Sequence, residues 1–91
     1  MLNRFEIAET ETFQRSISTK KGISKIYHKI KTYVYPQLRI NPFFGKNIKK
    51  LKGEFKDVYR YRIGEYRLFY QVAEKQIWIF IMDIVKRKDA Y

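Results

Sequence analysis

The amino-acid sequence predicts an α+β layered fold in which two helices pack on one face of an antiparallel sheet. Three observations lead to this prediction. The stretch from Phe55 to Val85 reads as three consecutive strands with tight turns, an apolar stripe of helical period precedes it, and a short alternating segment opens the chain. The predicted element order is β-α-α-β-β-β. Because the chain has no internal repeat, linker or low-complexity tract, residues 1–91 are expected to form a single domain.

The N-terminal elements are predicted from a weak alternation and from capping residues. Leu2–Ile7 alternates along a short segment and predicts a strand. Thr10 or Thr12 suits the N-cap of a first helix running to about Ser18, because a threonine oxygen accepts a hydrogen bond from a free backbone N–H. Gly22 then suits the C′ position that follows a helix.

The second helix is predicted over Ile23–Leu38. Its apolar residues repeat at about 3.6-residue intervals, so they form one stripe. Pro36 lacks a backbone donor and crowds the preceding turn, which predicts a kink or a restart of the helix there. Asn41-Pro42 ends the helix, and the lysine-rich segment Lys46–Gly53 is predicted to be a loop.

Three strands follow, over Phe55–Ile63, Tyr66–Ala73 and Ile77–Ile84. The first alternates aromatic with basic residues, as expected of a strand with one packed face and one wet face. Gly64-Glu65 and a turn around Glu74-Lys75 connect the strands. The third is apolar at nearly every position, which predicts a central strand covered on both faces. The sequence leaves open whether the second helix covers the side of Tyr59, Tyr61 and Tyr70 or its reverse.

The charge of the chain predicts a polyanionic partner. Twenty basic and nine acidic residues give a net charge of +11, and Thr12 to Gly53 holds eleven Lys or Arg and no carboxylate. Such a field attracts nucleic acid or an acidic protein. The chain has no cysteine, no signal-peptide pattern, and no apolar run longer than Ile77–Met82, which is too short to cross a bilayer. A cytoplasmic protein without membrane contact is expected.

The residue types exclude most enzyme chemistry and leave one class that needs no cofactor. A single histidine, His28, is read as a helix-surface residue, and no metal-ligand spacing or phosphate loop is present. RNA carries its own nucleophile, the 2′-OH, so its cleavage needs only alignment, proton transfer and stabilisation of the phosphate. Arginine and lysine suit the phosphate, and exposed tyrosines suit stacking on bases. The alternative reading, a soluble basic face over a packed one, stays open at this point. The residues that fit RNA cleavage are Lys52, Lys56, Arg60, Arg62, Arg67, Arg87, Lys88 and Tyr91.

Three segments resemble the RelE/ParE superfamily of bacterial toxins. They are LKG at Leu51–Gly53, YRYRIGEYRLFY at Tyr59–Tyr70, and KRKDAY at Lys86–Tyr91. The resemblance implies a RelE-like fold and a RelE-type toxin of a type II toxin–antitoxin pair. Such toxins are ribosome-dependent endoribonucleases that cut mRNA in the A site by 2′-OH attack, without metal or cofactor.

The resemblance also implies roles for individual residues. Arg67 would stabilise the transition-state phosphate, Arg87 would bind phosphate or donate a proton to the leaving group, and Tyr91 would stack on or orient the target nucleotide. The further RNA-binding residues would be Lys52, Lys56, Arg60, Arg62, Lys86 and Lys88.

One departure concerns the general base. Arg60 and Arg62 stand on the strand that carries two lysines in RelE, and arginine does not deprotonate at neutral pH. Related toxins use a glutamate after the second helix, where this chain has Lys49 or Lys50. Lys52, Lys56, Glu54, or the ribosome and the RNA themselves remain alternatives.

The implied partners are an acidic, partly disordered antitoxin, which would form a hetero-oligomer with this chain, and the 70S ribosome with mRNA in its A site. Two alternative functions stay open. One is a ParE-type toxin that inhibits DNA gyrase, and the other is an inactive module that only binds antitoxin. Arg67 and Tyr91 favour the endoribonuclease.

Overall fold

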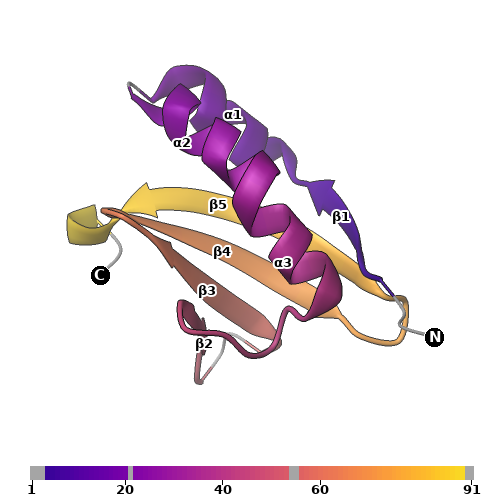
Figure 1. Cartoon of the computed structure of the whole chain (residues 1–91). Helices are drawn as coiled ribbons and strands as arrows, with labels where there is room; N and C mark the ends of the chain where they lie inside the picture. The colour runs from indigo at the N-terminus through magenta and orange to yellow at the C-terminus, as the bar shows by residue number, and fades with distance from the viewer. Residues whose placement is uncertain (1–3, 21, 54–55, 90–91) are drawn as a thin grey trace.

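The computed structural model describes residues 4–20, 22–53 and 56–89, so the expectations for Leu2, Glu54, Phe55 and Tyr91 lie outside the described residues. A five-stranded sheet has the order β1-β5-β4-β3-β2, with β1 parallel to β5 and the other neighbours antiparallel. Helices pack against it, which confirms the predicted α+β class (Figure 1). The elements are β1 (Glu6–Glu9), α1 (Glu11–Thr19), α2 (Ile23–Lys29), the π-helical segment η1 (Ile30–Val34), α3 (Tyr35–Ile40), β2 (Ile48–Lys50), β3 (Val58–Ile63), β4 (Tyr66–Ala73), β5 (Trp78–Lys86) and the 3₁₀ turn η2 (Arg87–Asp89).

The first strand lies further along the chain than predicted. β1 begins at Glu6 because its partner in β5 begins at Trp78, and the two residues are paired. Thr10 caps α1, since its Oγ1 accepts a hydrogen bond from the Phe13 amide at 3.2 Å. Gly22 has a φ of +76° but precedes α2 as its N-cap, so its predicted place at the C′ position of the first helix is wrong.

The second helix restarts near Pro36, as predicted, and continues to Ile40. Pro36 lies in the first turn of α3, where a missing donor costs little. In the π segment before it, the Tyr35 amide bonds to the Ile30 carbonyl five residues back. A π segment of this kind absorbs the mismatch that a proline introduces into a continuous helix.

The predicted strand bounds hold for β4 and shift for its neighbours. Lys46–Gly53 was predicted to be a loop, but Ile48–Lys50 forms the edge strand β2, and a three-residue lysine-rich strand offers almost no alternation to detect. β3 begins at Val58, since Asp57 has a φ of 62° and so breaks the extended chain before it. β5 continues to Lys86, two residues past the predicted end.

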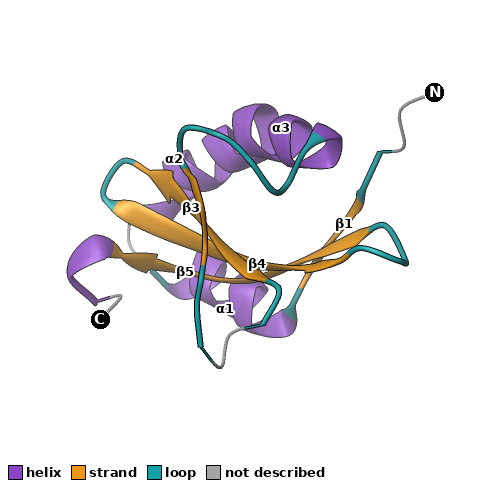
Figure 2. Ribbon diagram, turned by 90° about the horizontal axis from the view of Figure 1, so that it is seen from below, coloured by secondary structure: helices purple, strands orange, loops and turns teal. Residues whose placement is uncertain are grey.

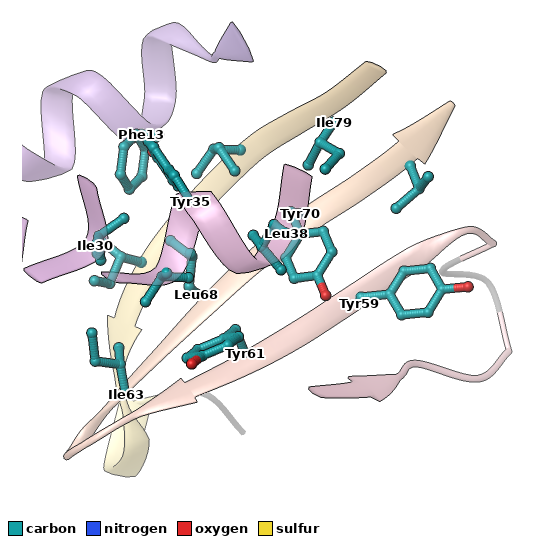
Figure 3. Close-up of a cluster of buried hydrophobic side chains, with 14 of the residues drawn as sticks. Phe13, Ile30, Tyr35, Leu38, Tyr59, Tyr61, Ile63, Leu68, Tyr70 and Ile79 are labelled. Atoms are coloured by element: carbon teal, nitrogen blue, oxygen red, sulfur yellow. The ribbon is translucent and has the colours of Figure 1, made fainter. Parts of the chain in front are cut away.

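The inner face of the sheet is the one that bears Tyr59, Tyr61 and Tyr70, and α2, η1 and α3 cross it (Figure 2). Figure 3 shows these tyrosines among the buried side chains of the core. The Tyr70 hydroxyl donates to the Pro42 carbonyl at 2.7 Å, so even its polar atom is satisfied inside. The side that bears Tyr59, Tyr61 and Tyr70, one of the two that the sequence left open, is therefore the side that the second helix covers. Fully buried members of this core include Phe13, Ile30, Val34, Leu38, Leu68, Ile79, Ile81 and Ile84.

The expectation that the last strand is covered on both faces is also wrong. β5 lies between β1 and β4, and its inner residues Ile79 and Ile81 are fully buried. On its outer face, Trp78, Phe80 and Met82 are 38%, 36% and 37% exposed. α2, η1 and α3 cover the inner face, whereas α1 packs along β5 beyond the end of β1, where Ser16 donates to Asp83 at 2.6 Å. The outer side of Trp78, Phe80 and Met82 stays partly exposed in the described structure. None of the helices in the described residues is long and apolar enough to cross a membrane.

Candidate functional site

The outer face carries an open groove where the β3–β4 hairpin meets the end of β5 and the turn η2, close together in Figure 1. We call it the basic groove. Its volume is about 780 Å³. It is lined by Arg60, Arg62, Gly64, Glu65, Arg67, Lys86, Arg87 and Lys88.

Strand register brings the arginines of the basic groove together. Arg62 of β3 is paired with Arg67 of β4, and Arg67 is paired with Val85 of β5. Paired residues on neighbouring strands project from the same face, so these side chains meet on the outer face. The Arg87 amide donates to the Glu65 carbonyl at 2.6 Å, which fastens the start of η2 to the hairpin.

The arginines differ in how far they reach into solvent. Arg67 is only 4% exposed, and its Nη1 donates to the Tyr66 carbonyl at 3.2 Å, so it forms the floor of the groove. Arg62 and Arg87 are exposed, and Arg60 is half-buried. The buried Nε of Arg60 has no hydrogen-bond partner among the described residues. The groove thus presents guanidinium groups at several depths, which suits a ligand with several oxygens.

Cations far outnumber carboxylates in the lining of the basic groove. Glu65 is the carboxylate in its lining. An exposed ion pair joins Arg15 and Glu11 on α1, at 3.2 Å, outside the groove. Like charges gathered at one site repel one another, and a bound anion relieves that repulsion.

Six of the nine predicted site residues come together in this groove: Arg60, Arg62, Arg67, Lys86, Arg87 and Lys88. Lys52 and Lys56 are exposed on the connection between β2 and β3 and do not line it. Tyr91 lies outside the described residues. Glu65 was not among the predicted site residues, although its place in the hairpin between two arginine-bearing strands was a usable signal.

Groups with displaced pKa values lie on the helical side of the sheet. Burial, together with a hydrogen bond to Glu9 and its charge, raises the pKa of Tyr27 to about 12. The same causes, burial first, raise the pKa of Tyr35. These phenols stay protonated at neutral pH and join β1 to the helices, so their role is structural. In the described part of the chain, no cluster of His, Cys, Asp and Glu is placed to hold a metal ion.

The fold is that of RelE-like toxins. A chain of the toxin–antitoxin complex RelBE2 from Mycobacterium tuberculosis matches with a TM-score of 0.76 at 20% identity, covering 92% of this chain and 99% of that one. A chain of the archaeal RelE–RelB complex from Pyrococcus horikoshii OT3 matches with a TM-score of 0.69 at 23% identity, covering 96% and 99%. The isolated E. coli RelE toxin matches with a TM-score of 0.69 at 21% identity, covering 90% and 83%.

The family follows from the sequence itself. Residues 18–91 match the model of the ParE toxin of the type II toxin–antitoxin system parDE, and the chain belongs to this family. It is therefore a toxin of a type II toxin–antitoxin system. No curated protein matches the chain.

Proposed function

We propose that this toxin is a ribosome-dependent endoribonuclease that cuts mRNA in the A site by 2′-OH attack, without metal or cofactor. The observation that carries the proposal is the basic groove, in which five cations surround the nearly buried guanidinium of Arg67. A fixed charge in a poorly solvated position stabilises a developing phosphate charge more strongly than a mobile surface charge does. Because ribosomes are the site of action, the protein works in the cytoplasm.

In the proposed reaction, the RNA supplies the nucleophile and the basic groove binds the phosphate. The 2′-oxygen attacks the adjacent phosphorus, the bond to the 5′-oxygen breaks, and the products are a 2′,3′-cyclic phosphate and a 5′-hydroxyl. Arg67 binds the phosphate from below, and Arg87 binds it from the exposed side. Tyr91 stacks on the target nucleotide, as the family resemblance implies. Lys52 and Lys56 bind RNA outside the groove.

Proton transfer draws on the groups of the groove that titrate. Glu65 is a carboxylate in its lining and suits accepting the proton of the 2′-OH. Lys86 and Lys88 place side-chain amino groups in the lining, which suit donating to the departing 5′-oxygen. This assignment avoids the arginines, which bind phosphate but do not exchange protons at neutral pH.

The proposed partners are the cognate antitoxin and the ribosome. Solved toxin–antitoxin complexes share the fold of this chain, which supports an antitoxin that forms a hetero-oligomer with it. The net charge of +11 favours rapid capture by an acidic antitoxin segment.

Cell-free translation followed by primer extension along the message tests the proposal. The native toxin is expected to create new 5′ ends in codon phase, and only when ribosomes are present. Arg87→Gln removes an exposed phosphate ligand and is expected to reduce cleavage by about 100-fold. Arg15→Gln, an exposed arginine of α1, is the matched control and should cut normally. Uncut message with the native toxin would refute the proposal.

A second candidate function is inhibition of DNA gyrase, which the match to the ParE toxin family favours. A gyrase supercoiling assay with the same protein separates the two. The endoribonuclease proposal expects normal supercoiling together with cut message, whereas a gyrase inhibitor blocks supercoiling and leaves message intact. A protein inactive in both assays would be an antitoxin-binding module.

A further inference from the structure

Three apolar side chains on the outer face of β5 have no covering layer in the described structure. We call Trp78, Phe80 and Met82 the outer strip. The rings of Trp78 and Phe80 lie within 12° of parallel, with centroids 6.2 Å apart. An antiparallel sheet normally carries polar residues on a face that is open to solvent. Aromatic rings on such a face therefore indicate a binding surface.

The outer strip continues from the basic groove on the same face of the sheet. Arg60 of β3 is paired with Phe69 of β4, and Gln71, two residues further along β4, is paired with Phe80. From Val85, beside Arg67, to Trp78 is seven residues, or about 23 Å at the usual rise of a strand. Asp83 lies between Val85 and Phe80 on β5, and its carboxylate accepts hydrogen bonds from the Ser16 hydroxyl of α1 at 2.6 Å and from the Ile84 amide at 2.8 Å. An extended ligand that runs from the groove to the strip therefore passes a hydrogen-bonded carboxylate.

We propose that the outer strip is a stacking platform for unpaired bases of the RNA strand whose phosphate lies in the basic groove. The proposal rests on the proposed endoribonuclease function and extends it to a second subsite. Proteins that hold single-stranded RNA combine a basic track for the backbone with aromatic side chains for the bases, often on the open face of a sheet. Gln71 lies exposed beside Phe80 and adds an amide able to bond a base edge.

The size and charge of the strip favour RNA over a protein partner. Three side chains, each about one-third exposed, offer much less than the roughly 800 Å² per partner that a stable protein interface buries. A second copy of this chain is disfavoured because each copy carries a charge of +11. The face next to the strip is the basic groove, which attracts a polyanion.

An exposed carboxylate lies at the far end of the strip. Glu6 of β1 is exposed and paired with Trp78. The hollow of about 1220 Å³ that Phe80 and Gln71 help to line holds two carboxylates, Asp57 and Glu74, and two lysines, Lys50 and Lys75, so its charges balance. Glu6 repels phosphates, so the strand is expected to stop at Trp78 rather than continue over β1. Glu6→Gln should therefore tighten RNA binding.

The single tryptophan of the chain makes the platform directly measurable. The free toxin is titrated at low salt with a ten-nucleotide oligouridylate, and both Trp78 fluorescence and oligonucleotide anisotropy are recorded. A ten-unit abasic strand with the same phosphates serves as the matched ligand. We expect the oligouridylate to quench Trp78 and the abasic strand to bind without quenching.

Two variants test the platform in the same assay. Phe80→Leu keeps the apolar surface and the Trp78 reporter but removes one ring, and should weaken oligouridylate binding by about 5- to 100-fold while leaving the abasic strand unaffected. Tyr33→Leu removes an exposed ring from η1, on the helical side, and should change neither.

The other outcomes overturn either the platform or the proposed function, and they can be told apart. Equal quenching by both strands, or unchanged affinity in Phe80→Leu, would show that bases do not stack on the strip. If Phe80→Leu left RNA binding unchanged but reduced rescue of growth by co-expressed antitoxin, the strip would be a protein contact. Message cut in cell-free translation without any quenching would refute the platform and keep the proposed function. Quenching without cutting would keep the platform and refute the function.

Discussion

The two faces of the sheet are built from alternate residues of the same strands, yet they differ in almost every property. On the inner face, Tyr61 and Tyr70 are buried under the helices, and their hydroxyl groups are hydrogen-bonded to Gln37 and Pro42. On the outer face, arginines gather at one end and aromatic rings lie open at the other. The inner face thus supplies stability, and the outer face is free to carry charge that would be costly in a core. Substitutions on the two faces should therefore affect different measurements.

The largest expected effect is on stability, from the inner face. Leu68→Ala creates a cavity at a fully buried position and should lower the free energy of unfolding by about 2–5 kcal/mol. Arg62→Gln, on the exposed side of the neighbouring strand, should change it by no more than about 0.5 kcal/mol. Urea denaturation of both variants checks the contrast. Equal losses would contradict the separation of the two faces.

The next effect is on activity, from the floor of the basic groove. Arg67→Lys keeps the charge but loses the forked geometry that binds two phosphate oxygens, so mRNA cleavage should fall about 10- to 100-fold. Arg39→Lys, a half-buried arginine of α3 outside the groove, is the matched control and should cut normally. Primer extension measures both. Full activity in Arg67→Lys would remove that side chain from the proposed mechanism.

A smaller effect on stability is expected from one buried hydroxyl. Tyr70→Phe keeps the ring, including its stacking on Tyr59 with centroids 5.7 Å apart, but removes the donor to the Pro42 carbonyl. The free energy of unfolding should fall by about 1 kcal/mol. Tyr33→Phe, at an exposed position, should be neutral. Equal melting temperatures for the two variants would show that the buried hydrogen bond adds nothing.

The smallest expected effect is a loss of folding stability that appears only at alkaline pH. The pKa of Tyr27 is raised from 10.0 to about 12 by burial and by Glu9, so the folded state holds this proton more tightly than the unfolded chain does. The stability it contributes is complete below pH 10 and is lost as the pH rises through about 12. Tyr27→Phe should reduce this loss, as measured by denaturation at a series of pH values. An identical pH profile would exclude Tyr27 as a source of the alkaline transition.

The sequence predicted the fold well where periodicity was long and regular. Alternation over Tyr66–Ala73 placed β4 with its observed bounds, and the helical stripe predicted the restart near Pro36. It failed for β2, which is three residues long and is held by pairing with β3 rather than by its own pattern. It also failed for the coverage of β5. An apolar run does not distinguish a strand covered on both faces from one whose second face is open.

The site was predicted in part because strand alternation fixes which residues share a face. Arg60, Arg62 and Arg67 were expected together and lie together in the groove. Lys52 and Lys56 were grouped with them by residue type and by the family resemblance, but they lie on the connection between β2 and β3 and do not line the groove. The outer strip was missed because Trp78 and Phe80 were assigned to a buried strand. Which face the helices leave open is a property of the tertiary fold, and local pattern does not encode it.

The proposed chemistry depends on the 2′-OH of the message, so a single-atom change in the RNA is the most direct test of the account. Primer extension first locates the cut, and the message is then made with a 2′-deoxynucleotide on the 5′ side of that phosphate. We expect translating ribosomes and native toxin to cut the unmodified message and to leave the deoxy-substituted one intact. Cleavage of both messages at the same phosphate would contradict attack by the 2′-OH and, with it, the role assigned to the basic groove.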